Sequence, residues 1–128
     1  MAPFDKTILI VEDDESQTNL LRSLFLARRF SVNFATNGIE ALEGLNENIP
    51  NAIILDIMMP KMDGYTFLEK IKGNALFRNI PAIVLSALPS SKNREKALSM
   101  GAYDYIEKPF TPSVLANKTL EAIEKLKE

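Results

Sequence analysis

The chain of 128 residues contains no cysteine and no histidine. Without cysteine it has no disulfide, no thiolate zinc site and no cysteine nucleophile. Without histidine it has no Ser-His-Asp triad, no imidazole base and no phosphohistidine of its own. Its chemistry must therefore use carboxylates, hydroxyls, lysine and any metal ion that these groups hold. The absence of cysteine also fits a cytoplasmic location, which we expect.

The sequence also lacks a strong excess of one charge and lacks long apolar runs. Its formal net charge of −2 argues against a nucleic-acid binder, which normally carries a basic patch. No apolar run is long enough to cross a bilayer or to form a signal peptide, so we expect no membrane partner. A length of 128 residues suits one domain with its own core. We therefore expect residues 1–128 to form a single domain without an output domain.

Strand-length apolar runs alternate with helical patterns along the whole chain. The runs are 7–11, 31–35, 52–55, 82–85 and 103–106. The second and fifth alternate apolar with polar residues, as half-exposed edge strands do, whereas the other three are continuously apolar, as strands covered on both faces are. This alternation predicts an α/β fold in which helices cover both faces of a five-stranded parallel sheet.

Helical stripes lie between these runs, and they predict which side chains face the core. In the first helix the predicted stripe is Leu20, Leu21 and Leu24. The last helix places a longer stripe on one face: Leu115, Thr119, Ala122, Ile123 and Leu126. The fourth helix, at about 91–100, is rich in lysine and arginine. We expect this helix to be the least buried and its basic side chains to form a solvated face.

Polar side chains follow the strands at the points where the strands end. They are Glu12, Asp13 and Asp14 after the first run, Asp56 after the third, Ser86 after the fourth and Lys108 after the fifth. The carboxyl ends of parallel strands share one edge of the sheet, so these groups should meet there. Clustered carboxylates need a cation, and hard oxygen ligands favour Mg²⁺. With a lysine and a hydroxyl beside it, Asp56 is placed to attack phosphorus. Asp14 is better explained by the positive amino terminus of the first helix.

These segments resemble the receiver domain of two-component response regulators of the chemotaxis type. The segments "ILIVEDD", "ILDIMMPKMDGYTFLEKIK", "AIVLSA" and "GAYDYIEKPF" match the four signature regions of that family in order and spacing. The resemblance covers residues 6–127. It implies the flavodoxin-like, doubly wound sheet of order 2-1-3-4-5 with five helices on both faces, which the second and fifth strands flank.

The resemblance also implies a role for each residue that matches a motif. Asp56 becomes the phosphoacceptor. The implied metal ligands are Glu12, Asp13, Asp56 and the backbone carbonyl of Met58, with Mg²⁺ as the ion and Mn²⁺ as a substitute. Lys108 and Ser86 join Asp56 as the catalytic groups, and Ser86 and Tyr105 form the switch pair. In this family the bond from the lysine to the following proline, here Lys108–Pro109, is usually cis.

As a function, the resemblance implies a stand-alone response-regulator receiver. A histidine kinase or a histidine phosphotransfer protein would donate the phosphoryl group, and a changed surface of the fourth helix, fifth strand and fifth helix would act on a downstream target protein. The domain would be a phosphoacceptor that catalyses only its own phosphorylation and dephosphorylation. One alternative is a pseudo-receiver that binds partners without phosphorylation. Another is an aspartyl-phosphate phosphohydrolase, which needs a second aspartate where this chain has Met58.

Four further positions carry hypotheses about lifetime and assembly. Met58 and Leu88 are apolar where many receivers have polar residues flanking the path of the hydrolytic water, so we expect a long-lived phosphoryl group. Asp104 and Lys118 stand where some dimerising receivers carry an acid and a base. The expected state is therefore a monomer or a weak, phosphorylation-linked dimer.

Overall fold

The computed structural model describes residues 6–58 and 62–125. In these ranges strands and helices alternate along the chain: β1 (Lys6–Val11), α1 (Glu15–Ala27), β2 (Phe30–Ala35), α2 (Gly38–Leu45), β3 (Ala52–Leu55), α3 (Gly64–Lys72), β4 (Ala82–Ser86), α4 (Ser90–Ser99), β5 (Asp104–Glu107) and α5 (Pro112–Lys125). The strands form a parallel sheet of order β2-β1-β3-β4-β5. The predicted fold class and strand order are confirmed. No helix in the described ranges has the length and hydropathy needed to cross a membrane.

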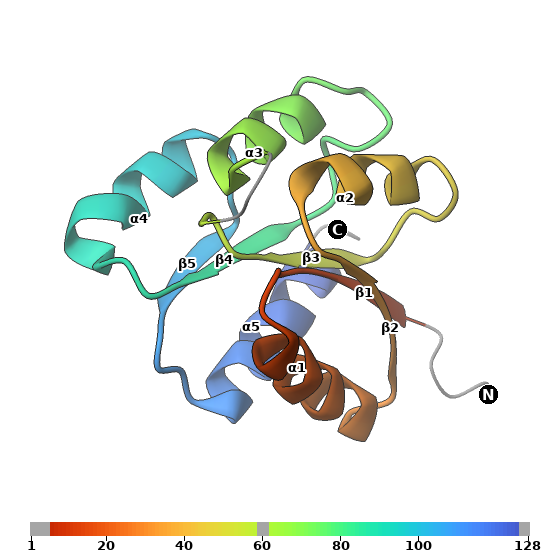
Figure 1. Cartoon of the computed structure of the whole chain (residues 1–128), viewed down its shortest axis with the longest axis vertical. Coiled ribbons are helices and arrows are strands. Elements are labelled where there is room, and N and C mark those ends of the chain that lie inside the picture. The colour runs from red at the N-terminus through yellow and green to blue at the C-terminus, as the bar shows by residue number, and fades with distance from the viewer. Residues whose placement is uncertain (1–5, 59–61, 126–128) are drawn as a thin grey trace.

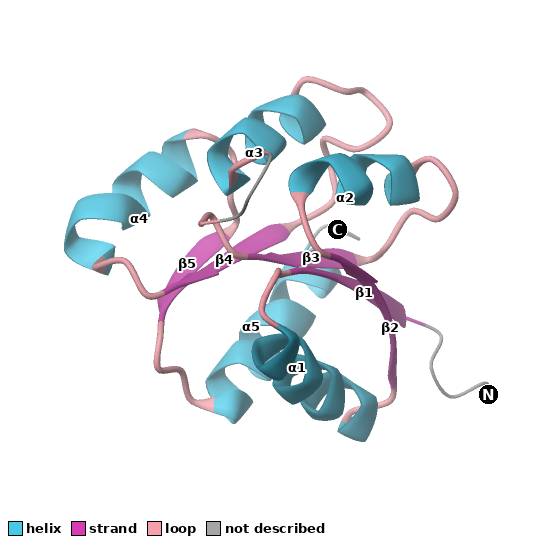
Figure 2. Cartoon of the chain, in the orientation of Figure 1, coloured by secondary structure: helices cyan, strands magenta, loops and turns pink. Residues whose placement is uncertain are grey.

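The sheet lies between two layers of helices. Helices α2, α3 and α4 cover one face, and α1 and α5 cover the other (Figures 1 and 2). Successive residues of the inner strands enter opposite cores: in β1, Leu9 packs towards α2 and α3, whereas Ile8 and Ile10 pack towards α1 and α5. This double burial is why the inner strands read as continuous apolar runs.

The two edges of the sheet are β2 and β5, as predicted, but neither divides cleanly into a buried and an exposed face. In β5 the successive residues Asp104 and Tyr105 are both buried. Asp104 tolerates burial because Arg94 and Lys118 pair with its carboxylate at 2.6 and 3.4 Å. In β2, Phe34 is 41% exposed. Alternation therefore identified the edges without predicting how each edge residue is covered.

One predicted core residue is wrong, and it lies on α1. Leu20 is 51% exposed, and Phe25 is fully buried together with Leu21. Residues 21, 24 and 25 are spaced three and four apart, so they share a helix face that excludes residue 20. In α5 the predicted stripe is confirmed for the buried residues Leu115, Thr119, Ala122 and Ile123, while Leu126 lies outside the described residues. Helix α4 is the least buried, as expected, with Ala97 as its buried residue.

Gly64 holds the loop after β3 against the start of α3. Its N–H donates to the carbonyl of Ile57 at 2.9 Å. A Cβ at this position would lie 2.4 Å from the Cα of Ile57 and 2.6 Å from its Cγ2. Only glycine allows this approach, and the approach positions the peptide that follows Asp56.

Replacing Gly64 with alanine should therefore destabilise the fold. We expect Gly64→Ala to lower the free energy of unfolding by about 2 kcal/mol or more, because the backbone of Ile57 cannot yield as a side chain can. Gly44→Ala is the matched control, since a Cβ at Gly44 meets nothing within 4 Å. The control should gain about 0.5 kcal/mol from helix propensity. Urea unfolding of both variants measures the difference, and equal midpoints would show that the contact is not a constraint.

Candidate functional site

Three carboxylates meet where β1 and β3 end. These strands are neighbours, and the N–H of Asp56 donates to the carbonyl of Val11 at 3.1 Å, which aligns the two strand ends. Glu12, Asp13 and Asp56 each place one carboxylate oxygen within 4.8 Å of the others. The three side chains therefore lie together at one edge of the sheet, where the sequence predicts them. Such a group of oxygen donors suits a hard divalent cation.

Lys108 is the cation that faces this cluster. Its Nζ lies 3.1 Å from Oε1 of Glu12 and 3.7 Å from Oδ2 of Asp56. Its backbone N–H donates to the carbonyl of Ser86 at 2.7 Å, and the Lys108–Pro109 peptide bond is cis, as the resemblance implied. Burial, and next the charge of Asp56, raise the pKa of Glu12, while Lys108 opposes that rise. One ammonium thus contacts two carboxylates in a group of three, so the formal charge of the cluster stays negative.

Two aspartates near the cluster cap helices. Asp14 accepts a hydrogen bond from the N–H of Gln17 at 3.0 Å and caps α1. Asp63 accepts one from the N–H of Thr66 at 2.9 Å and caps α3. Both satisfy backbone donors that the first helical turn leaves unpaired. The interpretation of Asp14 as a helix-terminal residue is confirmed.

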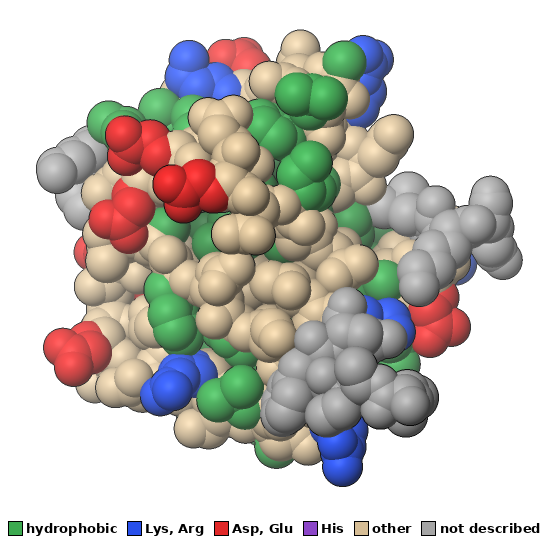
Figure 3. All heavy atoms as spheres, turned by 90° about the vertical axis from the view of Figure 1, so that its right-hand side faces the viewer, with side chains coloured by type: hydrophobic (Ala, Val, Ile, Leu, Met, Phe, Trp, Pro, Cys, Tyr) green, Lys and Arg blue, Asp and Glu red, His purple; other side chains and the backbone are tan. Residues whose placement is uncertain are grey.

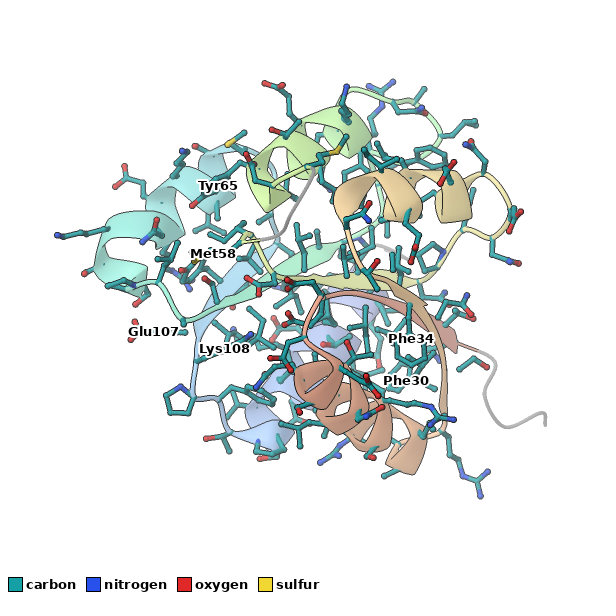
Figure 4. The ribbon with its side chains drawn as sticks, viewed as in Figure 1. Phe30, Phe34, Met58, Tyr65, Glu107 and Lys108 are labelled. Carbon is teal, nitrogen blue, oxygen red and sulfur yellow. The ribbon has the colours of Figure 1, made fainter. Side chains whose placement is uncertain are left out.

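The loop after β3 contacts the predicted acceptor directly. The backbone N–H of Met58 donates to Oδ1 of Asp56 at 3.0 Å. The side chain of Met58 is 60% exposed. Figure 4 shows Met58 and Lys108 reaching this region from the loops that follow β3 and β5. Asp56 is therefore held from the β3 side by a backbone donor and from the β5 side by a charge.

Ser86 and Tyr105 are linked through the backbone of Leu88. Ser86 is fully buried, and its Oγ accepts a hydrogen bond from the N–H of Leu88 at 3.1 Å. The carbonyl of Leu88 accepts one from the Tyr105 hydroxyl at 2.7 Å. Tyr105 is 3% exposed, and burial raises the pKa of its hydroxyl. The sequence argument gave Leu88 only a role beside the water path, because a backbone bridge leaves no signal in residue type.

The basic residues of α4 lie on an exposed face, as expected, but two of them make specific contacts. Arg94 donates to the carbonyl of Tyr105 at 3.0 Å in addition to its ion pair with Asp104. Lys96 lies 4.1 Å from the centre of the Tyr65 ring. Burial acts to raise the pKa of Asp104, but the N–H of Tyr105 and the charge of Arg94 outweigh it and lower that pKa. A dimer that used Asp104 and Lys118 between copies would first have to break their pairing within the chain.

Comparison with known proteins identifies the family. The chain matches the family model of the response regulator receiver domain over residues 8–120. It is 32% identical over 124 residues to the sensor histidine kinase CheAY of Helicobacter pylori, covering 95% of this chain and 15% of that protein. It is 36% identical over 108 residues to the response regulator PleD of Caulobacter vibrioides, covering 84% of this chain and 24% of that one. The chain therefore belongs to the response regulator receiver domain family, and it spans a quarter or less of these two relatives.

Solved receiver domains match in both fold and length. The receiver domain of a signal transduction histidine kinase from Syntrophus aciditrophicus is 34% identical with a TM-score of 0.88, and the match covers 96% of this chain and 93% of that one. The receiver domain of a sensor histidine kinase from Pseudomonas aeruginosa is 26% identical with a TM-score of 0.85, covering 93% and 98%. That structure holds a magnesium ion in its active site cleft. The chain is thus a receiver domain of two-component signalling.

The hydrogen bond between Tyr103, which directly precedes β5, and Glu121 of α5 gives a testable prediction about pH. The Tyr103 hydroxyl donates to Oε2 of Glu121 at 2.7 Å, and this hydrogen bond, with a smaller contribution from burial, raises the pKa of Tyr103 from 10.0 to about 12. A raised pKa in the folded state stabilises the fold below pH 10.0, and this stabilisation is lost as the pH rises towards 12. Glu121→Gln should return the titration of Tyr103 towards 10.0. Ring-carbon NMR shifts measured against pH resolve Tyr103 from Tyr65 and Tyr105. An unchanged midpoint in the variant would contradict the assignment.

Proposed function

We propose that Asp56 accepts a phosphoryl group from a phosphohistidine of a histidine kinase or a histidine phosphotransfer protein, in a reaction that requires Mg²⁺. The observation that supports this most is the convergence of Glu12, Asp13 and Asp56 on one small volume, with Lys108 facing two of them. This arrangement has an oxygen nucleophile, a metal-binding acidic pair and a fixed positive charge. These are the groups that phosphoryl transfer requires.

The donor set fits a magnesium ion. Glu12, Asp13, Asp56 and the backbone carbonyl of Met58 would hold it, with water and phosphoryl oxygens completing the shell. When bound, the ion neutralises charge on the carboxylates and on the phosphoryl oxygens. Mn²⁺ offers similar ligand chemistry and should substitute.

The chain's own residues perform the transfer. A carboxylate oxygen of Asp56 attacks phosphorus as the bond from phosphorus to the donor imidazole nitrogen breaks, and the bonding electron pair leaves with the imidazole. Lys108, 3.7 Å from Asp56, is placed to contact a phosphoryl oxygen with its ammonium group. Since the chain contains no histidine, the donor is a second protein.

A hollow beside the acidic cluster supports docking of that donor. It has a volume of about 410 Å³ and is lined mainly by apolar groups, among them Leu20, Ala87, Pro109, Phe110 and Pro112 next to Lys108. The donor histidine must reach Asp56, so the surface that surrounds it must cover this rim. Leu20, which the buried face of α1 excludes, would contribute its exposed side chain to this docking surface.

The hydrogen bonds of Leu88 suggest how phosphorylation changes the surface. If the Ser86 hydroxyl turns to a phosphoryl oxygen, the N–H of Leu88 loses its acceptor. The same residue holds the Tyr105 hydroxyl, and Arg94 of α4 holds the Tyr105 carbonyl. Movement of this loop would therefore change α4 and β5 together, and the surface of α4, β5 and α5 would act on the downstream target.

Intact-mass spectrometry tests the proposed acceptor and metal together. After incubation with acetyl phosphate and Mg²⁺, the wild-type chain should gain one phosphoryl group. The gain should disappear in Asp56→Asn, because this variant lacks the nucleophile. It should fall strongly without Mg²⁺, and also in Asp13→Asn, because this variant lacks a ligand of the ion.

Asp63→Asn is the matched control, because Asp63 caps α3 outside the carboxylate group and asparagine keeps the cap. This variant should be phosphorylated like the wild type. No adduct in the wild type under any condition would instead favour a pseudo-receiver that binds partners without phosphorylation.

The side chains at Met58 and Leu88 should lengthen the life of the phosphoryl group. Neither offers a hydrogen bond to an approaching water, so Met58→Asn/Leu88→Glu should accelerate dephosphorylation by about tenfold, equivalent to about 1.4 kcal/mol in the barrier. The decay is followed by intact mass after removal of the donor. Met58→Leu/Leu88→Met keeps both positions apolar and should decay as the wild type does. Equal rates in all three proteins would rule out a role for these side chains.

A further inference from the structure

Within residues 6–58 and 62–125, strand β2 forms an edge of the sheet that no other strand covers. The N–H of Glu12 donates to the carbonyl of Ala35, so Ala35 faces β1. Backbone groups alternate sides along a strand, and Val32 and Phe34 therefore direct their N–H and C=O groups to the outside. Among the described residues no strand pairs with this outer edge. Such an edge is a template for pairing with another chain.

The other edge of the sheet shows the usual protection. Strand β5 has four residues and carries two charged side chains, Asp104 and Glu107. Glu107 also accepts a hydrogen bond from the N–H of Ser90, which ties the start of α4 to that edge. Strand β2 has six residues, "FSVNFA", and contains neither a charged residue nor a proline. The fold thus blunts one edge and leaves the other able to pair.

A groove runs between β2 and α2 beside this edge. Its volume is about 310 Å³, and its lining includes Leu9, Asn33, Glu40, Gly44 and Glu47. Glu40 and Gly44 lie four apart on α2, and Glu47 follows two residues after the helix ends, so together they form one stripe along the groove. A Cβ added at Gly44 would meet nothing within 4 Å, which shows that the middle of the stripe is open. The molecular face on the β2 side carries a group of acidic side chains (Figure 3).

The two sides of the β2 edge differ in chemistry. On the α2 side Glu40 and Glu47 are exposed, and neither forms an ion pair with a described lysine or arginine. Glu40 accepts a hydrogen bond from the N–H of Thr36 at 3.0 Å, and Glu47 lines the groove. On the opposite side the ring of Phe34 is 41% exposed (Figure 4). A strand lying along this edge would meet acidic groups on one face and an aromatic ring on the other.

We propose that the β2 edge binds an extended basic segment of a partner protein by strand addition. Lysine or arginine at alternate positions would point to Glu40 and Glu47, and the apolar residues between them would pack on Phe34. Backbone hydrogen bonds to Val32 and Phe34 would supply affinity, and the alternating pattern would supply specificity. A second copy of this chain is a poorer occupant, because pairing two β2 edges brings the same glutamates together. None of the residues named for this binding belongs to the proposed phosphoryl-transfer site.

Fluorescence anisotropy with labelled peptides as long as β2 tests the proposal. The probe alternates arginine with valine, and its control has the same composition with the arginines and valines in separate blocks. We expect the alternating peptide to bind at least about fivefold more tightly, because only it can present all its charges on one face. Glu47→Lys should weaken its binding by about fivefold or more. Equal affinity of the two peptides, or no effect of Glu47→Lys, would reduce the contact to general charge attraction and overturn the proposal.

A second pair of variants tests the strand edge itself. Phe34→Pro removes an outward N–H without removing a bond to β1, whereas Phe34→Thr removes the ring and keeps the N–H. Binding should be lost in the first and reduced in the second. If Phe34→Pro does not fold, methylating the backbone nitrogens of the alternating probe tests the reciprocal hydrogen bonds, from the peptide N–H groups to the outward carbonyls of Val32 and Phe34, and unchanged binding would overturn the proposal. Sedimentation of the free protein distinguishes the remaining occupant: a wild-type dimer that is lost in Phe34→Pro, without peptide binding, would assign the edge to a second copy.

Discussion

The structure depends on the balance of charge among Glu12, Asp56 and Lys108. Two carboxylates from adjacent strands are held together only because an ammonium group 96 positions away from Glu12 in sequence reaches both. To do so, the Lys108 side chain must reach from the end of the edge strand β5 past the end of β4. The hydrogen bond from the Lys108 N–H to the carbonyl of Ser86 fixes its backbone beside β4. The strand order is what makes this reach possible: β1 and β3 bring the acids together, and β4 separates them from β5 by a single strand.

That balance is incomplete, because one ammonium group contacts two carboxylates. A raised pKa at Glu12 means that the folded state binds a proton more tightly than the unfolded chain, so its contribution to stability declines as the pH rises above 4.5. At neutral pH the fold therefore bears an electrostatic cost at this edge of the sheet. A bound cation would relieve this cost, and it would let the site take up the negative oxygen atoms of a phosphoryl group in the proposed reaction.

Much of this arrangement could be predicted from the sequence, because it follows from periodicity and strand ends. Three continuous and two alternating runs predicted the inner and edge strands, and the residues after each inner strand predicted the cluster. What could not be predicted depends on neighbours from other segments. Leu20 points outwards because Leu21, Leu24 and Phe25 define the buried face of α1. Asp104 of β5 can be buried because Arg94 of α4 and Lys118 of α5 pair with its carboxylate. The backbone of Leu88 bridges Ser86 and Tyr105, and this does not depend on the side chain of Leu88.

The acidic cluster also connects two surfaces that the fold keeps apart. On one side a series of hydrogen bonds links Ser86 through Leu88 to Tyr105, and Tyr105 to Arg94 of α4. On the other, the N–H of Glu12 donates to the carbonyl of Ala35, the last residue of β2. A strand added to the β2 edge would lie beside Ala35, whose carbonyl accepts the hydrogen bond from Glu12. Phosphorylation would instead act on Ser86. The two events would be coupled only if such a partner binds the phosphorylated and unphosphorylated states with different affinity, and the coupling would then act equally in both directions.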